Sequence, residues 1–335
     1  MKISKMVNAI DTHTMGEPTR IITSGIPNLK GSTMAEKREF LIDEMDHIRT
    51  ALMHEPRGHR DMFGALITQP TSTWADLGVI FMDAGGYLNM CGHGTIGAVT
   101  AALETGMIEP TEPFTQVTLD TPAGLVTARA TVEDRRVGEV SFTNVPSFLY
   151  KADVEIDVPD LGKLIIDISF GGSFFALVKA EDLGLEIIPK NTLELSKAGL
   201  KIREAVNEQV EIQHPFLTKI TTCDLVEIYG EPVKPGSNAR NVVIFGDGQV
   251  DRSPCGTGTC AKLATLYAKG QIKQDEIFVY ESILGTQFKG KVLGEETVGD
   301  FEAIIPEITA SAYITGLNTY IIDDRDPLKH GFLLY

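Results

Sequence analysis

Hydrophobic and polar residues follow each other along the chain in patterns that predict many short strands and few helices. In the first half, apolar or alternating runs bounded by Gly and Pro predict strands at 4–13, 19–26, 63–69, 78–83, 115–124 and 125–134. In the second half, the same pattern predicts strands at 164–178, 219–230, 241–247 and within 276–294, with helices at 191–208 and from about residue 256. This mixture is typical of an α/β protein.

The clearest helix signal lies at 32–56. Thr33 is the predicted N-cap, Glu36 completes a capping box three residues later, and Pro56 closes the segment. The apolar residues near helical spacing, which we expect on the buried face, are Phe40, Met45, Ile48 and Leu52.

The two halves of the chain contain copies of one unit. Residues 79–108 align without a gap with residues 243–272, at an offset of 164, and ten of thirty positions are identical. Each copy runs from a strand through a loop to Cys-Gly-x-Gly-Thr, an apolar helical stretch and a glycine suited to a helix end. A chain of 335 residues is long enough for two cores. Proline and acidic residues at 145–165 place the boundary between two lobes there.

Composition and charge exclude several classes of partner. The formal net charge of −16 gives little electrostatic attraction to nucleic acid or to an anionic membrane. No apolar run approaches the roughly 18 residues of a membrane span, and the N-terminus lacks the features of a signal peptide. We therefore expect a cytoplasmic protein, with neither nucleic acid nor membrane as a partner.

The glycine spacing at 92–97 fits the dinucleotide fingerprint G-x-G-x-x-G, but its context does not. About seven residues separate the strand at 79–83 from Cys91, whereas a dinucleotide-binding fold turns directly from strand to helix. The glycines instead let a small ligand approach the first N–H groups of a helix, where an anion is favoured. We expect a carboxylate at these positions.

The cysteines at the two helix starts are the strongest candidates for chemistry. A thiol at a helix N-terminus is expected to have a lowered pKa, because the positive end of the dipole stabilises the thiolate. Cys91 and Cys255 lie at matched positions, so they would face each other across a cleft if the lobes are related by approximate two-fold symmetry. One sulfur could then remove a proton from a carbon acid while the other returns a proton to the opposite face, without a cofactor.

Other interpretations of the cysteines are inert burial, a disulfide or a zinc site. Four cysteines are too few and too scattered for a disulfide framework, and Cys91-Gly-His93 is too cramped for a convincing pair of zinc ligands. We expect no metal and no cofactor. Cys223 lies in an apolar strand and Cys260 in the body of a helix, so both are predicted to be core residues.

The motifs at 89–106, NMCGHGTIGAVTAALETG, and at 251–259, DRSPCGTGT, resemble those of the proline racemase family, which has the diaminopimelate epimerase-like fold. Further motifs carry the resemblance over the whole chain: IDTHTMGEPTRI, EPRGHRDMFGALIT, DISFGGSFFA, EIQHP and DPLKHGF. The resemblance implies two pseudo-symmetric α/β lobes, each a curved sheet or barrel around a central helix, with the active site in the cleft between the lobes. It implies an N-terminal lobe of residues 1–150 carrying Cys91, with residues 311–335 crossing back onto it, a C-terminal lobe of 151–310 carrying Cys255, and a homodimer.

The resemblance also implies roles for individual residues in a cofactor-independent racemase that interconverts L- and D-proline. Cys91 and Cys255 would exchange the α-proton, and Asp251 would pair with the ring ammonium of the substrate. First-turn N–H donors to the substrate carboxylate would come from Gly92, His93, Gly256 and Thr257. The pocket walls would be Phe63 and Phe245.

Each of these roles has an alternative. Phe245 aligns with Phe81, a spacing that equally suits a strand interior, Asp251 could be a helix cap or a solvated loop acid, and His93 could contribute only its backbone. A 4-hydroxyproline 2-epimerase also keeps both cysteines. In the trans-3-hydroxyproline dehydratases of the family a threonine typically replaces the second cysteine, so Cys255 argues against that reaction. A non-catalytic amino-acid-binding protein would have no reason to keep both thiols.

Overall fold

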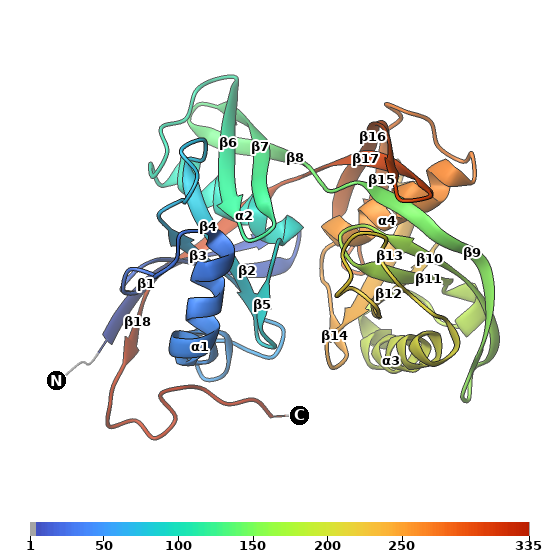
Figure 1. Ribbon diagram of the computed structural model, residues 1–335, viewed down its shortest axis with the longest axis horizontal. Coiled ribbons are helices and arrows are strands. Elements are labelled where there is room, and N and C mark those ends of the chain that lie inside the picture. The colour runs from blue at the N-terminus through green and yellow to red at the C-terminus, as the bar shows by residue number, and fades with distance from the viewer. Residues whose placement is uncertain (1–4, 335) are drawn as a thin grey trace. The chain divides into compact units, whose positions relative to one another are not determined.

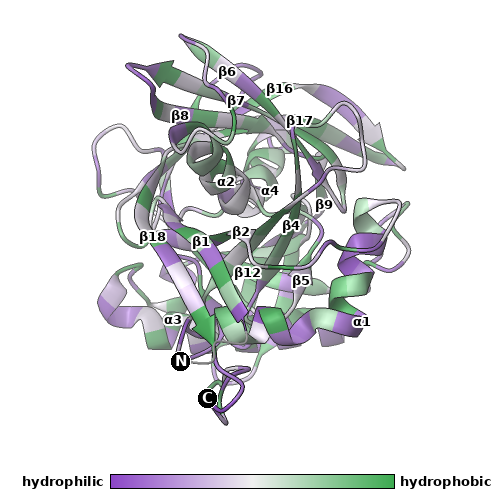
Figure 2. Ribbon diagram, turned by 90° about the vertical axis from the view of Figure 1, so that its left-hand side faces the viewer, coloured by the Kyte–Doolittle hydropathy of each residue, from purple (hydrophilic) through white to green (hydrophobic). Residues whose placement is uncertain are grey.

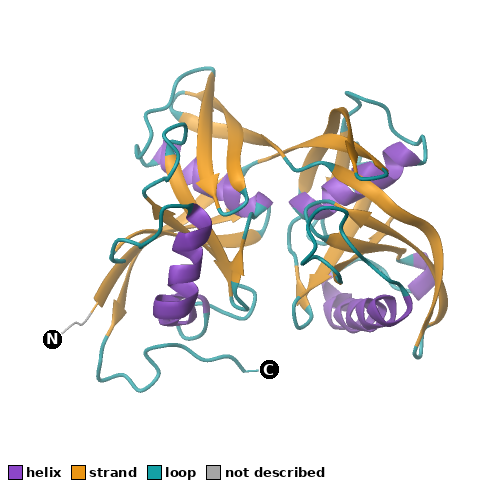
Figure 3. Cartoon of the chain, in the orientation of Figure 1, coloured by secondary structure: helices purple, strands orange, loops and turns teal. Residues whose placement is uncertain are grey.

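The computed structural model describes residues 5–334, and its contacts divide the chain into two units, each described here by itself (Figure 1). Unit 1 comprises residues 1–142 and 311–335, and unit 2 comprises residues 143–310. The expected boundary near residue 150 falls within β9 (Ser147–Val158), which pairs with strands of unit 2. Strands are the main regular structure of both units, as Figure 3 shows.

Unit 1 is a curved sheet of strands paired in one continuous order. That order is β8 (Arg136–Thr143), β7 (Gly124–Glu133), β6 (Phe114–Thr121), β4 (Leu77–Asp83), β3 (Phe63–Thr68), β2 (Glu17–Ser24), β1 (Lys5–Thr14) and β18 (Ala312–Ile322). The short strand β5 (Tyr87–Leu88) pairs with the end of β4. Because β18 pairs with β1 along its length, the segment Ala312–Ile322 belongs to the sheet of this unit.

Unit 2 is a closed barrel of eight strands. Around the ring these are β9, β10 (Gly162–Phe170), β11 (Phe174–Lys179), β12 (Cys223–Gly230), β13 (Ala239–Phe245), β15 (Phe278–Glu281), β16 (Gln287–Val298) and β17 (Phe301–Ala310). The ring closes because β17 pairs with β9. The short strand β14 (Gln249–Val250) pairs with β13, and two 3-10 turns, η1 (Glu181–Leu183) and η2 (Pro189–Asn191), follow β11.

Each unit encloses one helix and carries another on its outside. The enclosed helices, α2 (Gly92–Glu104) and α4 (Gly256–Ala268), are apolar almost throughout, and α2 is buried at every position except its last. The outer helices, α1 (Met34–Met53) and α3 (Thr192–Gln209), bury only one face. Figure 2 shows this for α1, where hydrophilic and hydrophobic stretches alternate along the helix. The composition of each helix therefore matches its place, because a helix surrounded by strands has no face in water.

Two details of the secondary structure differ from the sequence prediction. The segment 164–178 is two antiparallel strands, β10 and β11, because Gly172 adopts a φ of 116° in the turn between them. Thr33 caps α1 as predicted, but the carboxylate of Glu36 accepts hydrogen bonds from the N–H and hydroxyl of Ser32 at 2.7 and 2.6 Å rather than from the N-cap itself. The capping box is thus shifted by one residue.

Within residues 5–334, no helix combines the length and the apolar character needed to cross a membrane.

Candidate functional site

The first candidate thiol lies at the start of the helix enclosed by unit 1. Cys91 is the N-cap of α2, with an extended backbone at a φ of −143°, and its side chain is 6% exposed. Its Sγ atom lies 3.4 Å from Nδ1 of His93. The first N–H groups of a helix have no partner within the helix, so Gly92 and His93 present donors beside this sulfur.

His93 supplies more than a backbone group. Its imidazole is buried, and burial lowers its pKa to about 3, so the ring is neutral near pH 7. The Phe63 ring packs edge-on against it at a centroid distance of 4.5 Å, and Thr14 donates a hydrogen bond of 2.8 Å to the His93 carbonyl. The predicted pocket wall Phe63 and the predicted binding residue His93 are therefore in contact, next to Cys91.

The second thiol lies at the start of the helix enclosed by unit 2, but its surroundings differ. Cys255 is the N-cap of α4 at a φ of 63°, a left-handed conformation that costs energy for a residue other than glycine. Its Sγ atom accepts a hydrogen bond of 3.4 Å from the N–H of Gly258 and lies 3.6 Å from the hydroxyl of Thr257. The sulfur therefore sits directly over the first turn of α4.

The loop before this thiol is fixed by Asp251. The Asp251 carboxylate accepts hydrogen bonds of 2.8 Å from both the N–H and the hydroxyl of Ser253, whose hydroxyl in turn accepts one of 3.1 Å from the N–H of Cys255. Asp251 is buried, so it is not the solvated loop acid of the alternative interpretation. On the other side, the Gly171 backbone approaches Thr257 so closely that a Cβ at this glycine would lie 2.1 Å from the Thr257 carbonyl oxygen.

The expectation of a lowered thiol pKa is wrong for Cys255. Burial raises the pKa of this thiol well above its ordinary value, and the negative charge of Asp251 raises the pKa further. The hydrogen bond from Gly258 acts in the opposite direction, as the helix-terminus argument predicts, but burial outweighs it. Cys255 is therefore a thiol rather than a thiolate near neutral pH.

The strand registers change the comparison of Phe245 with Phe81. Phe81 is fully buried within β4 and pairs with Ala65, whereas Phe245 ends β13, is half-buried and pairs with Gln249. The interpretation of Phe245 as a strand-interior counterpart of Phe81 is therefore wrong. Two residues more separate the strand from the cysteine in the second copy than in the first, because β4 ends at Asp83 and β13 at Phe245, and this explains the difference.

Cys223 and Cys260 are fully buried core residues, as predicted, and all four cysteines are free. Among residues 5–334, no group of three or more His, Cys, Asp or Glu side chains is arranged to hold a metal ion.

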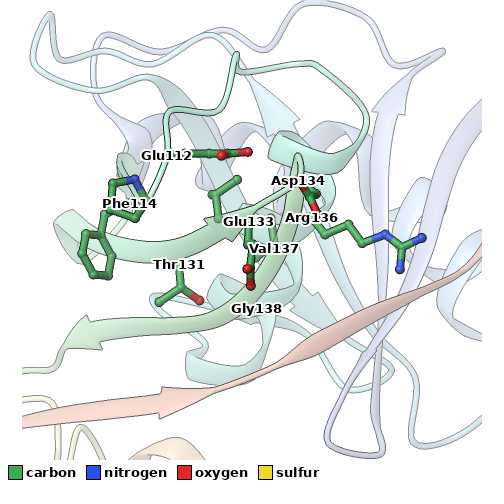
Figure 4. A pocket seen from close by; sticks show the side chains of 10 residues that line it. Glu112, Phe114, Thr131, Glu133, Asp134, Arg136, Val137 and Gly138 are labelled. Atoms are coloured by element: carbon green, nitrogen blue, oxygen red, sulfur yellow. The ribbon is translucent and has the colours of Figure 1, made fainter.

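Two pockets lie away from the thiols. A cavity of about 860 Å³ in unit 1 is lined by charged and polar side chains of β6 to β8 and the segment before them, shown in Figure 4. Those labelled there include Glu112, Phe114, Thr131, Glu133 and Arg136. A second cavity, of about 1010 Å³, lies in unit 2 and includes Lys262 and Tyr229. Neither cavity is lined by a site residue expected from the sequence.

Sequence reasoning missed a buried polar cluster in unit 2. Glu227, Tyr280 and Lys262 lie within or beside apolar runs, and only their placement on β12, β15 and α4 brings them together. The signal in the sequence is weak, because one acid in an apolar strand usually marks its solvent-facing side.

The chain is similar to known proteins over its whole length. Residues 9–333 match the protein family described as proline racemase. The proline racemase of Clostridioides difficile is 60% identical over 334 residues, with full coverage of both chains, and proline racemase A of Trypanosoma cruzi is 51% identical over 352 residues, covering 100% of this chain and 83% of that protein. A hydroxyproline epimerase from Agrobacterium vitis, solved with bound trans-4-hydroxy-L-proline, superposes with a TM-score of 0.90 at 35% identity, covering 100% of this chain and 96% of that chain.

Proposed function

The chain belongs to the proline racemase family, and we propose that it interconverts L- and D-proline by a two-base mechanism without a cofactor. The observation that carries the proposal is the pair of thiols at matched helix starts. Cys91 and Cys255 each precede an enclosed helix in one of two units with the same succession of strands and helices. The identity of 60% with a proline racemase over the whole chain supports proline as the substrate.

In the proposed reaction the thiols act on opposite faces of the α-carbon. One sulfur, as thiolate, removes the α-proton while the other, as thiol, donates a proton to the opposite face, so configuration inverts and the thiols exchange protonation states. Negative charge develops on the substrate carboxylate as the proton leaves. The first-turn N–H groups of Gly92, His93, Gly256 and Thr257 would stabilise this charge, because donors fixed before the reaction need no reorganisation.

The remaining site residues would bind the ring. Asp251 would pair with the ring ammonium, and its position is set by its hydrogen bonds to Ser253. Phe63 and Phe245 would form the apolar walls around an unsubstituted pyrrolidine. The neutral imidazole of His93 would leave Cys91 free to change its own charge, because it adds no charge of its own near pH 7.

The test is α-proton exchange in D₂O with single variants of each thiol. We expect Cys91→Ser and Cys255→Ser to retain the fold and to lose racemisation by about a thousandfold or more, the scale of acid–base catalysis. Cys260→Ala is the matched control, because this cysteine lies on the same helix as the Cys255 N-cap and is core. Full racemase activity in either serine variant would refute the two-base scheme.

A 4-hydroxyproline 2-epimerase is the second candidate. The likeness to the Agrobacterium vitis epimerase, solved with trans-4-hydroxy-L-proline, favours it. Exchange rates for L-proline and trans-4-hydroxy-L-proline, compared as kcat/KM, decide between the two. Faster exchange of the hydroxylated substrate would replace the first proposal with the second. Loss of water from trans-3-hydroxy-L-proline would instead identify a dehydratase, against which Cys255 argues.

We also propose a homodimer in the cytoplasm, with the four cysteines reduced. The support is the family resemblance for the dimer, and the free state of all four cysteines for a reducing compartment. Light scattering on the purified chain tests the dimer, and a mass of one chain would contradict it.

A further inference from the structure

A buried carboxylate lies beneath the first turn of α4. Glu227 on β12 is fully buried, and its Oε1 atom accepts a hydrogen bond of 2.6 Å from the hydroxyl of Tyr280 on β15. Its Oε2 atom lies so close to Gly258 that a Cβ at this glycine would be 2.6 Å from the oxygen. Gly258 is the residue whose N–H donates to Cys255 Sγ, so the carboxylate and the thiol contact the same turn.

Further polar groups surround this carboxylate. Lys262, one turn along α4 from Gly258, is 5% exposed, and its Nζ atom lies 3.0 Å from the centroid of the Tyr229 ring. Asn241 on β13 is fully buried and donates a hydrogen bond of 2.8 Å to the carbonyl of Pro254, the residue before Cys255. The cluster thus contacts the backbone on both sides of Cys255, at Pro254 through Asn241 and at Gly258 through Glu227.

Burial opposes both charges of the cluster. It raises the pKa of Glu227 and lowers the pKa of Lys262. The Tyr280 hydrogen bond and the positive charge of Lys262 favour the Glu227 anion. The charges that face Lys262 from other positions are Asp167 on β10, Lys179 on β11 and Lys269 on α4, and the charged groups that act on Cys255 are Asp251 and Glu227.

Unit 1 provides an internal comparison, because the two units share a strand register. Leu77 pairs with Leu119 as Ala239 pairs with Tyr280. One residue before each of these pairs, the register is again the same. The N–H of Asp76 donates a hydrogen bond to the carbonyl of Thr118, and the N–H of Asn238 donates one to the carbonyl of Val279, both at 2.8 Å. The counterpart of Tyr280 is therefore Leu119.

The same register assigns the other counterparts. Ala65 pairs with Phe81, and Phe81 contacts Gly94 on α2; Glu227 pairs with Val243, and Val243 contacts Gly258 on α4. The counterparts of Glu227, Asn241 and Lys262 are therefore Ala65, Val79 and Ala98. All of these unit 1 residues, like Leu119, are buried and apolar. The shared scaffold therefore folds without the cluster, which points to a role beyond folding.

We propose that Glu227 is a positioning residue for Cys255. The buried negative charge of Glu227, together with burial and Asp251, keeps the proton on this thiol before the substrate binds. The inference rests on the proposed function and deepens it. Because the two-base scheme needs one thiolate, Cys91 is then the base that takes the α-proton first, and Cys255 S–H is the acid that supplies the replacing proton. Tyr280 and Lys262 hold the Glu227 anion in place.

The experiment measures thiol ionisation rather than turnover. In a Cys91→Ser background, the rate of Cys255 alkylation by iodoacetamide is followed by mass spectrometry as a function of pH. Glu227→Gln keeps the size of the side chain and an acceptor for Tyr280 but removes the charge. We expect the midpoint of alkylation to fall by about one pH unit, the effect of one nearby charge at an intermediate dielectric. An unchanged midpoint would overturn the proposal.

The matched control is Glu281→Gln. Glu281 is also buried in unit 2, but it binds Arg240 and the N–H groups of Val233 and Lys234, and it is not among the main groups that act on Cys255. We expect the pH midpoint of Cys255 alkylation in this variant to equal that of the Cys91→Ser parent. An equal shift in this control would assign the effect to general loss of buried charge and would also overturn the proposal.

A second variant covers the case in which Glu227→Gln does not fold. Combining Glu227→Leu, Lys262→Met and Tyr280→Phe gives unit 2 an apolar cluster like that of unit 1, and such replacement of a buried ion pair is often tolerated. The alkylation midpoint of this variant should also fall, because the variant removes the negative charge of Glu227, which with Asp251 disfavours the Cys255 thiolate. Since alkylation needs no racemase activity, a chain that shifts as expected but never exchanges the α-proton refutes the proposed function alone.

Discussion

At the scale of single residues, the two thiols have equivalent positions and different chemistry. Cys91 lies beside an uncharged imidazole, whereas Cys255 lies over a helix start flanked by two buried acids, Asp251 and Glu227. In the proposed two-base scheme a racemase must accept both enantiomers, so the reaction would need both thiols in both protonation states. A difference in their surroundings therefore sets which state is present first and not whether inversion occurs.

The buried imidazole of His93 has a consequence for stability. Its pKa is about 3 in the folded chain and about 6.5 in an unfolded chain, so between these values only the unfolded state binds the proton. Stability should therefore fall as pH decreases below about 6.5, by up to ~1.4 kcal/mol for each pH unit from this group. His93→Gln should remove that part of the slope.

Urea unfolding at a series of pH values between about 6.5 and 4.5 measures this slope. A slope that is equal in His93→Gln and the unaltered chain would show that His93 is not held neutral.

At the scale of elements, α3 packs on β13 without room for another carbon. A Cβ at Gly199 would lie 2.6 Å from Cγ1 and 2.7 Å from Cβ of Ile244. Overpacking of this kind costs ~1–3 kcal/mol, against a gain of about 1 kcal/mol in helix propensity. We expect Gly199→Ala to lower the free energy of unfolding by ~1 kcal/mol, within a net range of about 0–2 kcal/mol, measured by urea titration.

Gly294→Ala on β16 is the control for that substitution, because a Cβ there meets no atom within 4 Å. It should leave the free energy of unfolding nearly unchanged. If both substitutions change the free energy of unfolding equally, the close packing of α3 on β13 is not the reason for the effect at position 199.

Local sequence patterns predict some elements of this chain and miss others. Helix α1 could be predicted because its N-cap, apolar face and closing proline are all local signals. The split of 164–178 into β10 and β11 was missed because a short turn with one glycine hardly interrupts an apolar run. Glu227 was missed for a different reason. On a barrel strand whose inner face packs on a helix, burial at 226–228 no longer alternates, so the pattern does not reveal an acid that points inward.

For the whole molecule, the duplication distinguishes the features that both units share from the polar residues found in one unit. Both units place a cysteine before an enclosed helix and have a glycine where that helix meets the neighbouring strand, Gly94 in one and Gly258 in the other. These shared features could be predicted from the repeated motif. The polar cluster around Glu227 could not, because it occurs in one copy only and its members are far apart in sequence.

The first and last strands of the chain pair in unit 1, and this leads to a prediction about the whole chain. Strand β18 pairs with β1 from Lys5 opposite Ile322 to Thr14 opposite Ala312. The Tyr320 ring lies 4.1 Å from the guanidinium of Arg20, and its hydroxyl donates a hydrogen bond of 2.9 Å to Asp11. The sheet of unit 1 is therefore complete only when β18 is present.

A chain that ends after Ala310 should therefore keep unit 2 folded and lose the structure of unit 1. Without β18, β1 becomes an unpaired edge, and Asp11 and Arg20 lose the aromatic ring that covers them. Limited trypsin digestion should cut within residues 1–142 and spare 143–310, and racemase activity should be absent. A chain that ends after Arg325 keeps β18 and should resist digestion like the full chain. Equal resistance of unit 1 in both truncated chains would mean that β1 to β8 form a stable sheet without the returning strand.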